Sequence, residues 1–136
     1  KLGIALVSVA VRGPEEFGGA LDTMLGQNVQ AVILQTLFSA TSRQFIEPAL
    51  ARGLPCVGDQ PVFAEKGALL AFGSDRPHLF GRAAAQIDRI LRGSNPGDIP
   101  VEGPTTFWLA ANQKTARTLG LTLPASLLIR ADEVIE

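Results

Sequence analysis

Short apolar runs alternate with helical stripes along the first half of the chain. Residues 4–11 (IALVSVAV) are apolar and rich in β-branched side chains, which predicts a buried strand. Two shorter apolar runs, at 31–34 and 55–58, predict further strands. Residues 14–26 and 40–52 instead repeat their apolar side chains at helical spacing. This order of strands and helices is typical of a parallel sheet covered by helices.

The second half continues with longer elements and one irregular stretch. It is predicted to contain a strand at 68–72, a helix at 78–92, a surface loop at 94–104, a strand at 106–111, a helix at 113–119 and a short helix or packed tail at 126–135. In the helix at 78–92, Phe80, Ile87 and Leu91 share one side. We therefore expect residues 1–136 to form a single α/β domain, a parallel sheet flanked by helices on both faces.

Composition narrows the class of protein further. Hydrophobic residues make up 46% and charged residues 18% of the 136 positions, which is typical of a folded chain. The net charge of -1, without a basic cluster, argues against nucleic-acid binding. No apolar run approaches the roughly 20 residues of a membrane span, and the chain shows no signal peptide.

The residues that carry chemistry are few. The single cysteine, Cys56, excludes an intramolecular disulfide, and its apolar surroundings predict a buried thiol. The single histidine, His78, follows Pro77 at a helix start, where a capping or solvated role is expected. Neither a Gly-x-Ser-x-Gly turn nor a phosphate-binding loop is present. We predict no enzyme activity, cofactor or metal; a small α/β enzyme using Asp59 or Cys56 is the alternative.

Polar and aromatic side chains follow three of the predicted strands, at 35–38, 59–63 and 72–76. In open α/β sheets, ligands collect at the carboxyl ends of strands. Amide, hydroxyl, carboxylate and aromatic groups there suit an amino acid or another small organic solute. The predicted binding residues are Gln35, Thr36, Asp59, Gln60, Phe63, Phe72 and Gly73. Alternatively, these loops are polar as in any α/β domain and their phenylalanines belong to the core.

Two longer segments carry a resemblance to a known family. Residues 81–107 (GRAAAQIDRILRGSNPGDIPVEGPTTF) resemble a stretch of ABC-transporter substrate-binding proteins of the tryptophan/tyrosine type. Residues 112–136 (NQKTARTLGLTLPASLLIRADEVIE) are similar to the usual C-terminus of that family. The match is looser upstream, where ALARGLPCVGDQPVFAEKGALLAFGSD is the best-matching part.

The resemblance implies a type I periplasmic-binding fold, in which two α/β lobes close on a solute without catalysis. It also implies a periplasmic or otherwise extracytoplasmic location, delivery to an ABC permease, and an aromatic or aliphatic amino acid as a candidate solute. By position, residues 1–72 correspond to part of the second lobe and residues 73–136 to the return segments. The first lobe and the first strand of the second lobe have no counterpart in the sequence, so the fold is incomplete relative to the family.

Two further expectations follow from that incompleteness. An unpaired sheet edge and an uncovered apolar face favour self-association, so we expect a homodimer. A ligand-sensing regulatory domain of the same fold, or a truncated homologue without ligand binding, are the alternative functions.

Overall fold

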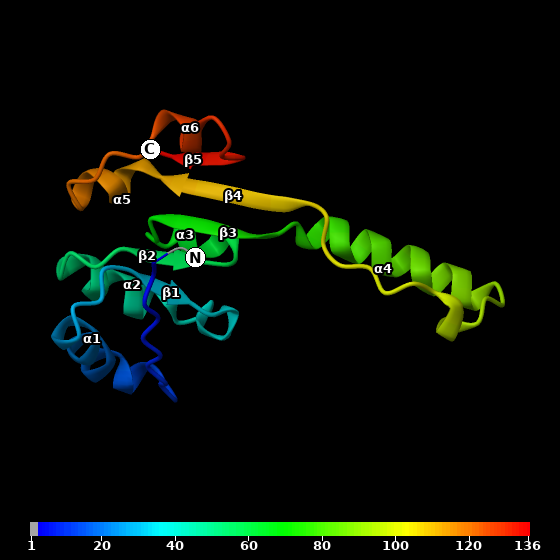
Figure 1. The fold of residues 1–136 in the computed structure, drawn as a ribbon, viewed down its shortest axis with the longest axis horizontal. Helices are drawn as coiled ribbons and strands as arrows, with labels where there is room; N and C mark the ends of the chain where they lie inside the picture. Colours follow the sequence, from blue (N-terminus) through cyan, green and yellow to red (C-terminus); the bar gives the residue numbers. More distant parts are fainter. Residues whose placement is uncertain (1–2) are drawn as a thin grey trace.

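The computed structural model describes residues 3–136, which form one five-stranded sheet (Figure 1). The spatial order follows the sequence, β1 to β5. Pairing is parallel for β1/β2, β2/β3 and β4/β5 and antiparallel for β3/β4. The strands are β1 (Val32–Leu34), β2 (Cys56–Gly58), β3 (Leu70–Ser74), β4 (Phe107–Asn112) and β5 (Glu133–Ile135). The predicted α/β class with a mostly parallel sheet is confirmed.

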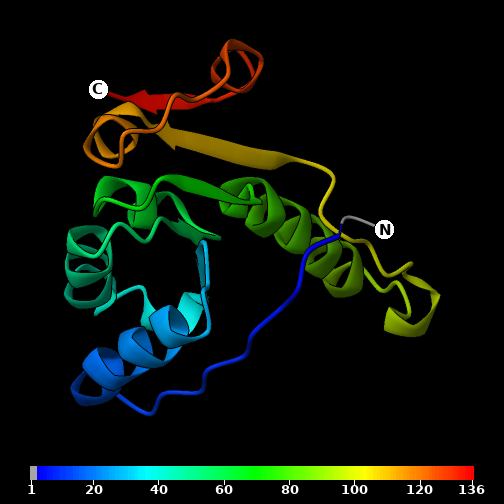
Figure 2. The ribbon, with the colours of Figure 1, turned by 60° about the vertical axis from the view of Figure 1, so that its left-hand side comes forward.

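Three helices build the main core on one side of this sheet. They are α1 (Phe17–Gly26), α2 (Ser42–Ala51) and α3 (Pro61–Glu65); a 3₁₀ turn, η1 (Pro14–Glu16), precedes α1. Figure 2 shows α1 and α2 stacked beside the strands. Their buried side chains form one cluster with those of β1 and β2, including Phe17, Leu21, Val32, Leu34, Phe45, Ile46, Cys56 and Phe63.

On the opposite face of the sheet, three large apolar side chains, from β1, β3 and β4, are exposed. Ile33 is 73% exposed, and Phe72 and Phe107 stack on each other with 5.5 Å between ring centroids while both remain about half exposed. Trp108, next to Phe107, packs against Ala71 and Ala110 on the helix side. Neighbouring residues of a strand point to opposite faces, so only Trp108 of this pair packs against the core.

Residues 4–11 do not form the predicted buried strand. They are extended but pair with no strand of the described chain, and most of their side chains are exposed. A strand is stable only when a neighbour satisfies its backbone groups, and the apolar pattern alone does not supply that neighbour. The prediction was wrong because the β-strand propensity of residues 4–11 does not show whether another strand lies beside them.

The longest helix, α4 (Arg76–Leu91), projects away from the sheet (Figure 1). None of its described residues is buried, so the predicted stripe of Phe80, Ile87 and Leu91 is present but has no cover. The chain returns along α4 through η3 (Pro96–Asp98) to β4. The Arg82 guanidinium holds the segment after η3 against α4 by donating hydrogen bonds to the Glu102 carboxylate and to Thr105 Oγ1.

The C-terminal part adds two short helices, α5 (Gln113–Thr118) and α6 (Ala125–Leu128), and the unpredicted strand β5. Buried Asn112 links them to the core, because its side chain donates to the Ala64 carbonyl and accepts from Thr115 N–H. Thr115 Oγ1 donates to the Gly67 carbonyl. Among the described residues, no helix has the length and apolarity that a membrane crossing requires.

Candidate functional site

The carboxyl ends of β1 and β2 lie side by side. Leu34 is paired in register with Gly58, so the chain leaves the sheet at Gln35 and at Asp59 on adjacent strands. There Thr36 Oγ1 donates a hydrogen bond to the Asp59 carboxylate. Both residues are exposed to solvent. The structure therefore brings together two of the predicted polar groups from segments 23 residues apart.

Gly73 on β3 packs tightly against the same loop. A Cβ atom added at Gly73 would lie 2.0 Å from the Asp59 carbonyl oxygen, which is far inside van der Waals contact. Only glycine fits this close approach of two backbones. The segments after β1 and β2 thus meet β3 at one point, with Asp59 at the centre.

Ser42 and Lys66, which the sequence analysis did not single out, stabilise the turn after β1 by hydrogen bonds. This turn contains η2 (Thr36–Phe38), and the carbonyl of the next residue, Ser39, accepts hydrogen bonds from Lys66 Nζ at 2.7 Å and from Ser42 Oγ at 2.9 Å. Lys66 follows α3, so a long-range contact ties η2 to the third helix. The local pattern around Lys66 carries no signal for this role.

The predicted aromatic residues have different positions. Phe63 is 0% exposed and lies in the core below Gly58, because the predicted loop at 59–63 contains the start of α3 at Pro61. Its side chain has no access to a solute. Phe72 is exposed, and its ring stacks on the ring of Phe107. Gln35 is exposed and Gln60 is half-buried, each next to the Thr36–Asp59 contact in the chain.

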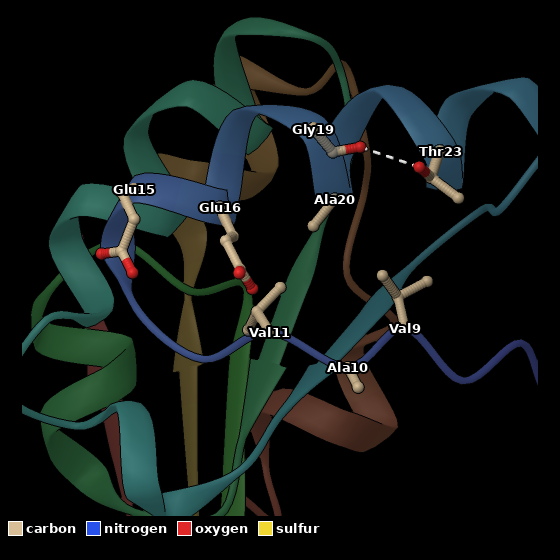
Figure 3. A pocket seen from close by; sticks show the side chains of 8 residues that line it. All are labelled: Val9, Ala10, Val11, Glu15, Glu16, Gly19, Ala20 and Thr23. Carbon is tan, nitrogen blue, oxygen red and sulfur yellow. Dashed lines mark hydrogen bonds between the residues drawn. The ribbon is translucent and has the colours of Figure 1, made fainter.

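The strand-end site is open. Two surface grooves lie elsewhere in the described part of the chain. One, of about 410 Å³, separates residues 9–11 from α1 (Figure 3); the other, of about 270 Å³, lies between α4 and residues 96–102. The carboxylate of Asp75, directly after β3, caps α4 by accepting a hydrogen bond from the His78 N–H.

The single cysteine, Cys56, is a buried free thiol. Burial raises the pKa of the Cys56 thiol from 9.0 to about 12, so the thiol is protonated and unreactive near neutral pH. Within residues 3–136, no group of three or more His, Cys, Asp or Glu side chains is arranged to hold a metal ion.

The buried thiol predicts a measurable pH dependence. Folding disfavours the thiolate, so the stability linked to Cys56 should be complete below pH 9 and decline as the pH rises toward 12. The stability deficit of Cys56→Ala relative to wild type should therefore shrink across this range, by up to about 1.4 kcal/mol per pH unit. Denaturant titrations of both proteins at several pH values measure it. A deficit that stays constant above pH 9 would contradict the burial of this thiol.

Several solved structures share this architecture. A conserved domain protein from Vibrio cholerae O1 biovar El Tor superposes with a TM-score of 0.84 at 23% identity, over 97% of this chain and 45% of that one. An ABC domain from Streptococcus pneumoniae, solved in complex with L-Trp, gives 0.83 at 24% identity, over 98% and 45%. The ligand-free substrate-binding protein CD0873 from Clostridium difficile gives 0.72 at 18%, over 99% and 45%.

These likenesses establish the fold, and the present chain spans less than half the length of each of the three structures. No curated protein matches it. The sequence profile described as "ABC transporter substrate binding protein" matches residues 1–135, which is nearly the whole chain. The chain therefore belongs to the ABC transporter substrate-binding protein family.

Proposed function

We propose that this chain contributes one wall of a solute-binding cleft in an extracytoplasmic component of an ABC transporter. The observation that carries the proposal is the meeting of Thr36, Asp59 and Gly73 at the ends of three adjacent strands. That edge of an α/β sheet is where ligands collect. Phe63 is left out of the contact set because it is core; the proposed set is Gln35, Thr36, Asp59, Gln60, Phe72 and Gly73.

The chemistry of this wall suits an amino acid or a similar small organic solute. The exposed Asp59 carboxylate, held by the Thr36 hydroxyl, can accept hydrogen bonds from an ammonium group. Gln35 and Gln60 supply amide donors and acceptors on either side. The exposed ring of Phe72 offers an apolar surface to a side chain. The L-Trp complex of the streptococcal structure supports an aromatic amino acid as the first solute to test.

The wider assignment rests on the family, which is a non-enzymatic transport component and typically extracytoplasmic. We propose a permease as the partner and a periplasmic or equivalent location. We also propose that residues 1–72 belong to the second lobe and residues 73–136 to the return segments. The uncovered stripe on α4 supports this division, because a return helix would pack on another lobe. Self-association into a homodimer is the remaining proposal.

Solute binding by the 136-residue chain can be measured residue by residue with ¹H–¹⁵N NMR titration. Adding tryptophan, and separately leucine, should shift the amides next to Thr36 and Asp59, with weak affinity because one wall is open to water. Asp59→Asn should weaken binding about tenfold or more, since a hydrogen bond to a charged group contributes about 1.5–3 kcal/mol.

Asp22→Asn is the matched control, because Asp22 is an exposed carboxylate on α1 whose salt bridge to Arg52 lies away from the strand ends. It should leave the affinity unchanged. Shifts that appear away from residues 35–36 and 59–60, or an Asp59→Asn variant that binds as well as wild type, would rule out this wall as the site. Absence of shifts with every amino acid would favour a truncated homologue that binds no solute.

A further inference from the structure

An aromatic residue of β4 lies at the same edge of the sheet as the proposed solute wall. β4 runs antiparallel to β3, so its first residues lie beside the carboxyl end of β3. Trp108 is paired in register with Gly73, the glycine that packs against Asp59. The antiparallel neighbour thus brings the start of one strand to the edge where the other strands end. Patterns that follow strands in the sequence do not reveal such a position.

Trp108 and Asp59 also lie on the same face of the sheet. Directly opposite residues of an antiparallel pair project their Cβ atoms to one face, about 4.5–5.5 Å apart. A Cβ built at Gly73 would lie 2.0 Å from the Asp59 carbonyl oxygen, so the segment after β2 crosses β3 on that face. The stacked rings of Phe72 and Phe107 point to the other face, because each is one position away along its strand. Of the aromatic residues in β3 and β4, Trp108 is therefore the neighbour of Asp59.

The indole of Trp108 lies over small side chains and keeps part of its surface accessible. It packs against a cluster that consists of Ala64, Ala71 and Ala110, and the residue is neither fully buried nor fully exposed. Ala64 belongs to α3, the helix that begins at Pro61, directly after the Asp59 segment. The indole thus lies beside α3 with one part on the core and another part open to solvent.

We infer that the Trp108 indole contacts the side chain of a solute whose ammonium group is held by Asp59, and that this contact favours aromatic over aliphatic amino acids. The inference rests on the proposed function and assigns a specificity-determining residue to the same wall. The ammonium group and the side chain of an amino acid share one carbon atom, so a solute bound at Asp59 places its side chain close by. Two aromatic rings in contact attract each other beyond their buried area, which corresponds to about a two- to tenfold gain in affinity.

NMR on the unmodified protein tests the contact directly. The chain has a single tryptophan, so its ¹H–¹⁵N spectrum contains one indole N–H signal. Titration with phenylalanine should shift this signal together with the amides of Thr36 and Asp59. Nuclear Overhauser effects between the ring protons of phenylalanine and the indole protons of Trp108 should also appear. These effects report proximity and require no substitution.

Substitutions at Trp108 separate solute contact from a structural role. Trp108→Leu should reduce the affinity for phenylalanine about two- to tenfold and change that for leucine less. Trp108→Phe keeps a ring and should retain most of the preference for phenylalanine. Phe80→Leu is the control, because Phe80 is 66% exposed on α4, which projects away from the sheet (Figure 1). It should leave both affinities unchanged. A residue that only covers Gly73 would lower both affinities in proportion when replaced.

The outcomes distinguish this inference from the proposed function. An indole signal that stays in place and shows no Overhauser effect, while the amides of Thr36 and Asp59 shift, would overturn the inference and leave the solute wall standing. Equal losses for phenylalanine and leucine in Trp108→Leu would do the same. Absence of shifts at Thr36 and Asp59 with every amino acid would overturn both. If Trp108→Leu does not fold, the Overhauser effects in the wild type decide.

Discussion

Replacing Phe63 with alanine should lower the free energy of unfolding by about 3–5 kcal/mol, the loss typical of a buried phenylalanine. Phe63 is completely buried and belongs to the cluster that joins α1, α2, β1 and β2. Its ring also packs closely against Gly58, where an added Cβ would lie 2.3 Å from Phe63 Cγ. Chemical denaturation followed by circular dichroism measures the loss.

Phe72→Ala is the control for this experiment. Phe72 is 54% exposed and contacts mainly the ring of Phe107, so its removal should affect stability much less. NMR titration should distinguish the two positions as well. Phe72→Ala should reduce solute affinity, whereas Phe63→Leu, a milder change in the core, should leave the affinity unchanged. Equal stabilities for Phe63→Ala and Phe72→Ala would mean that Phe63 does not occupy the core as described.

The position of Phe63 shows where strand-end reasoning from sequence reaches its limit. An aromatic residue five positions after a short strand fits a binding loop as well as a buried helix. The signal that favoured the helix was Pro61, because proline is common in the first turn of a helix and Val62 to Glu65 can continue it. The turn is only five residues long, too short for an apolar periodicity to reveal its buried side.

Helices were the more predictable part of the fold because their hydrogen bonds are local. The limits of α2 and α4 agree with the sequence pattern to within about two residues, the usual ambiguity of helix ends. Strand pairing depends on a second segment, so residues 4–11 satisfied every local criterion and still found no neighbour. The antiparallel pairing of β3 with β4 could not be predicted from the sequence either, because α4 and the loop that follows it separate the two strands along the chain.

The candidate site was predicted in part for the same reason. Adjacent parallel strands end at one edge of a sheet, which is sufficient to place Gln35 and Thr36 near Asp59 and Gln60. The contacts that shape the site cross between elements and have no local signature. They are the hydrogen bond from Lys66 to the Ser39 carbonyl and the close approach of Gly73 to Asp59.

The approach of Gly73 to Asp59 leads to the second large prediction. Gly73→Ala places a methyl group where the Asp59 carbonyl oxygen lies, at 2.0 Å, and both partners are backbone. Backbone cannot rotate away as a side chain can, so β3 and the loop after β2 must separate. We expect a loss of about 1–3 kcal/mol in the free energy of unfolding, or more, as for other overpacked sites.

The movement of β3 away from the loop after β2 should also change the proposed solute-binding residues. Moving Asp59 disrupts its hydrogen bond from Thr36, so the NMR signals of both residues should shift and solute affinity should fall. Gly81→Ala is the matched control: Gly81 lies in α4, nothing lies within 4 Å of its added Cβ, and alanine there should stabilise by about 0.5–1 kcal/mol. If glycine-to-alanine substitution lowers the free energy of unfolding at Gly73 and raises it at Gly81, the loss at Gly73 is due to its contact with Asp59. A Gly73→Ala variant as stable as wild type, with unshifted signals at Thr36 and Asp59, would show that the three strand ends do not meet as described.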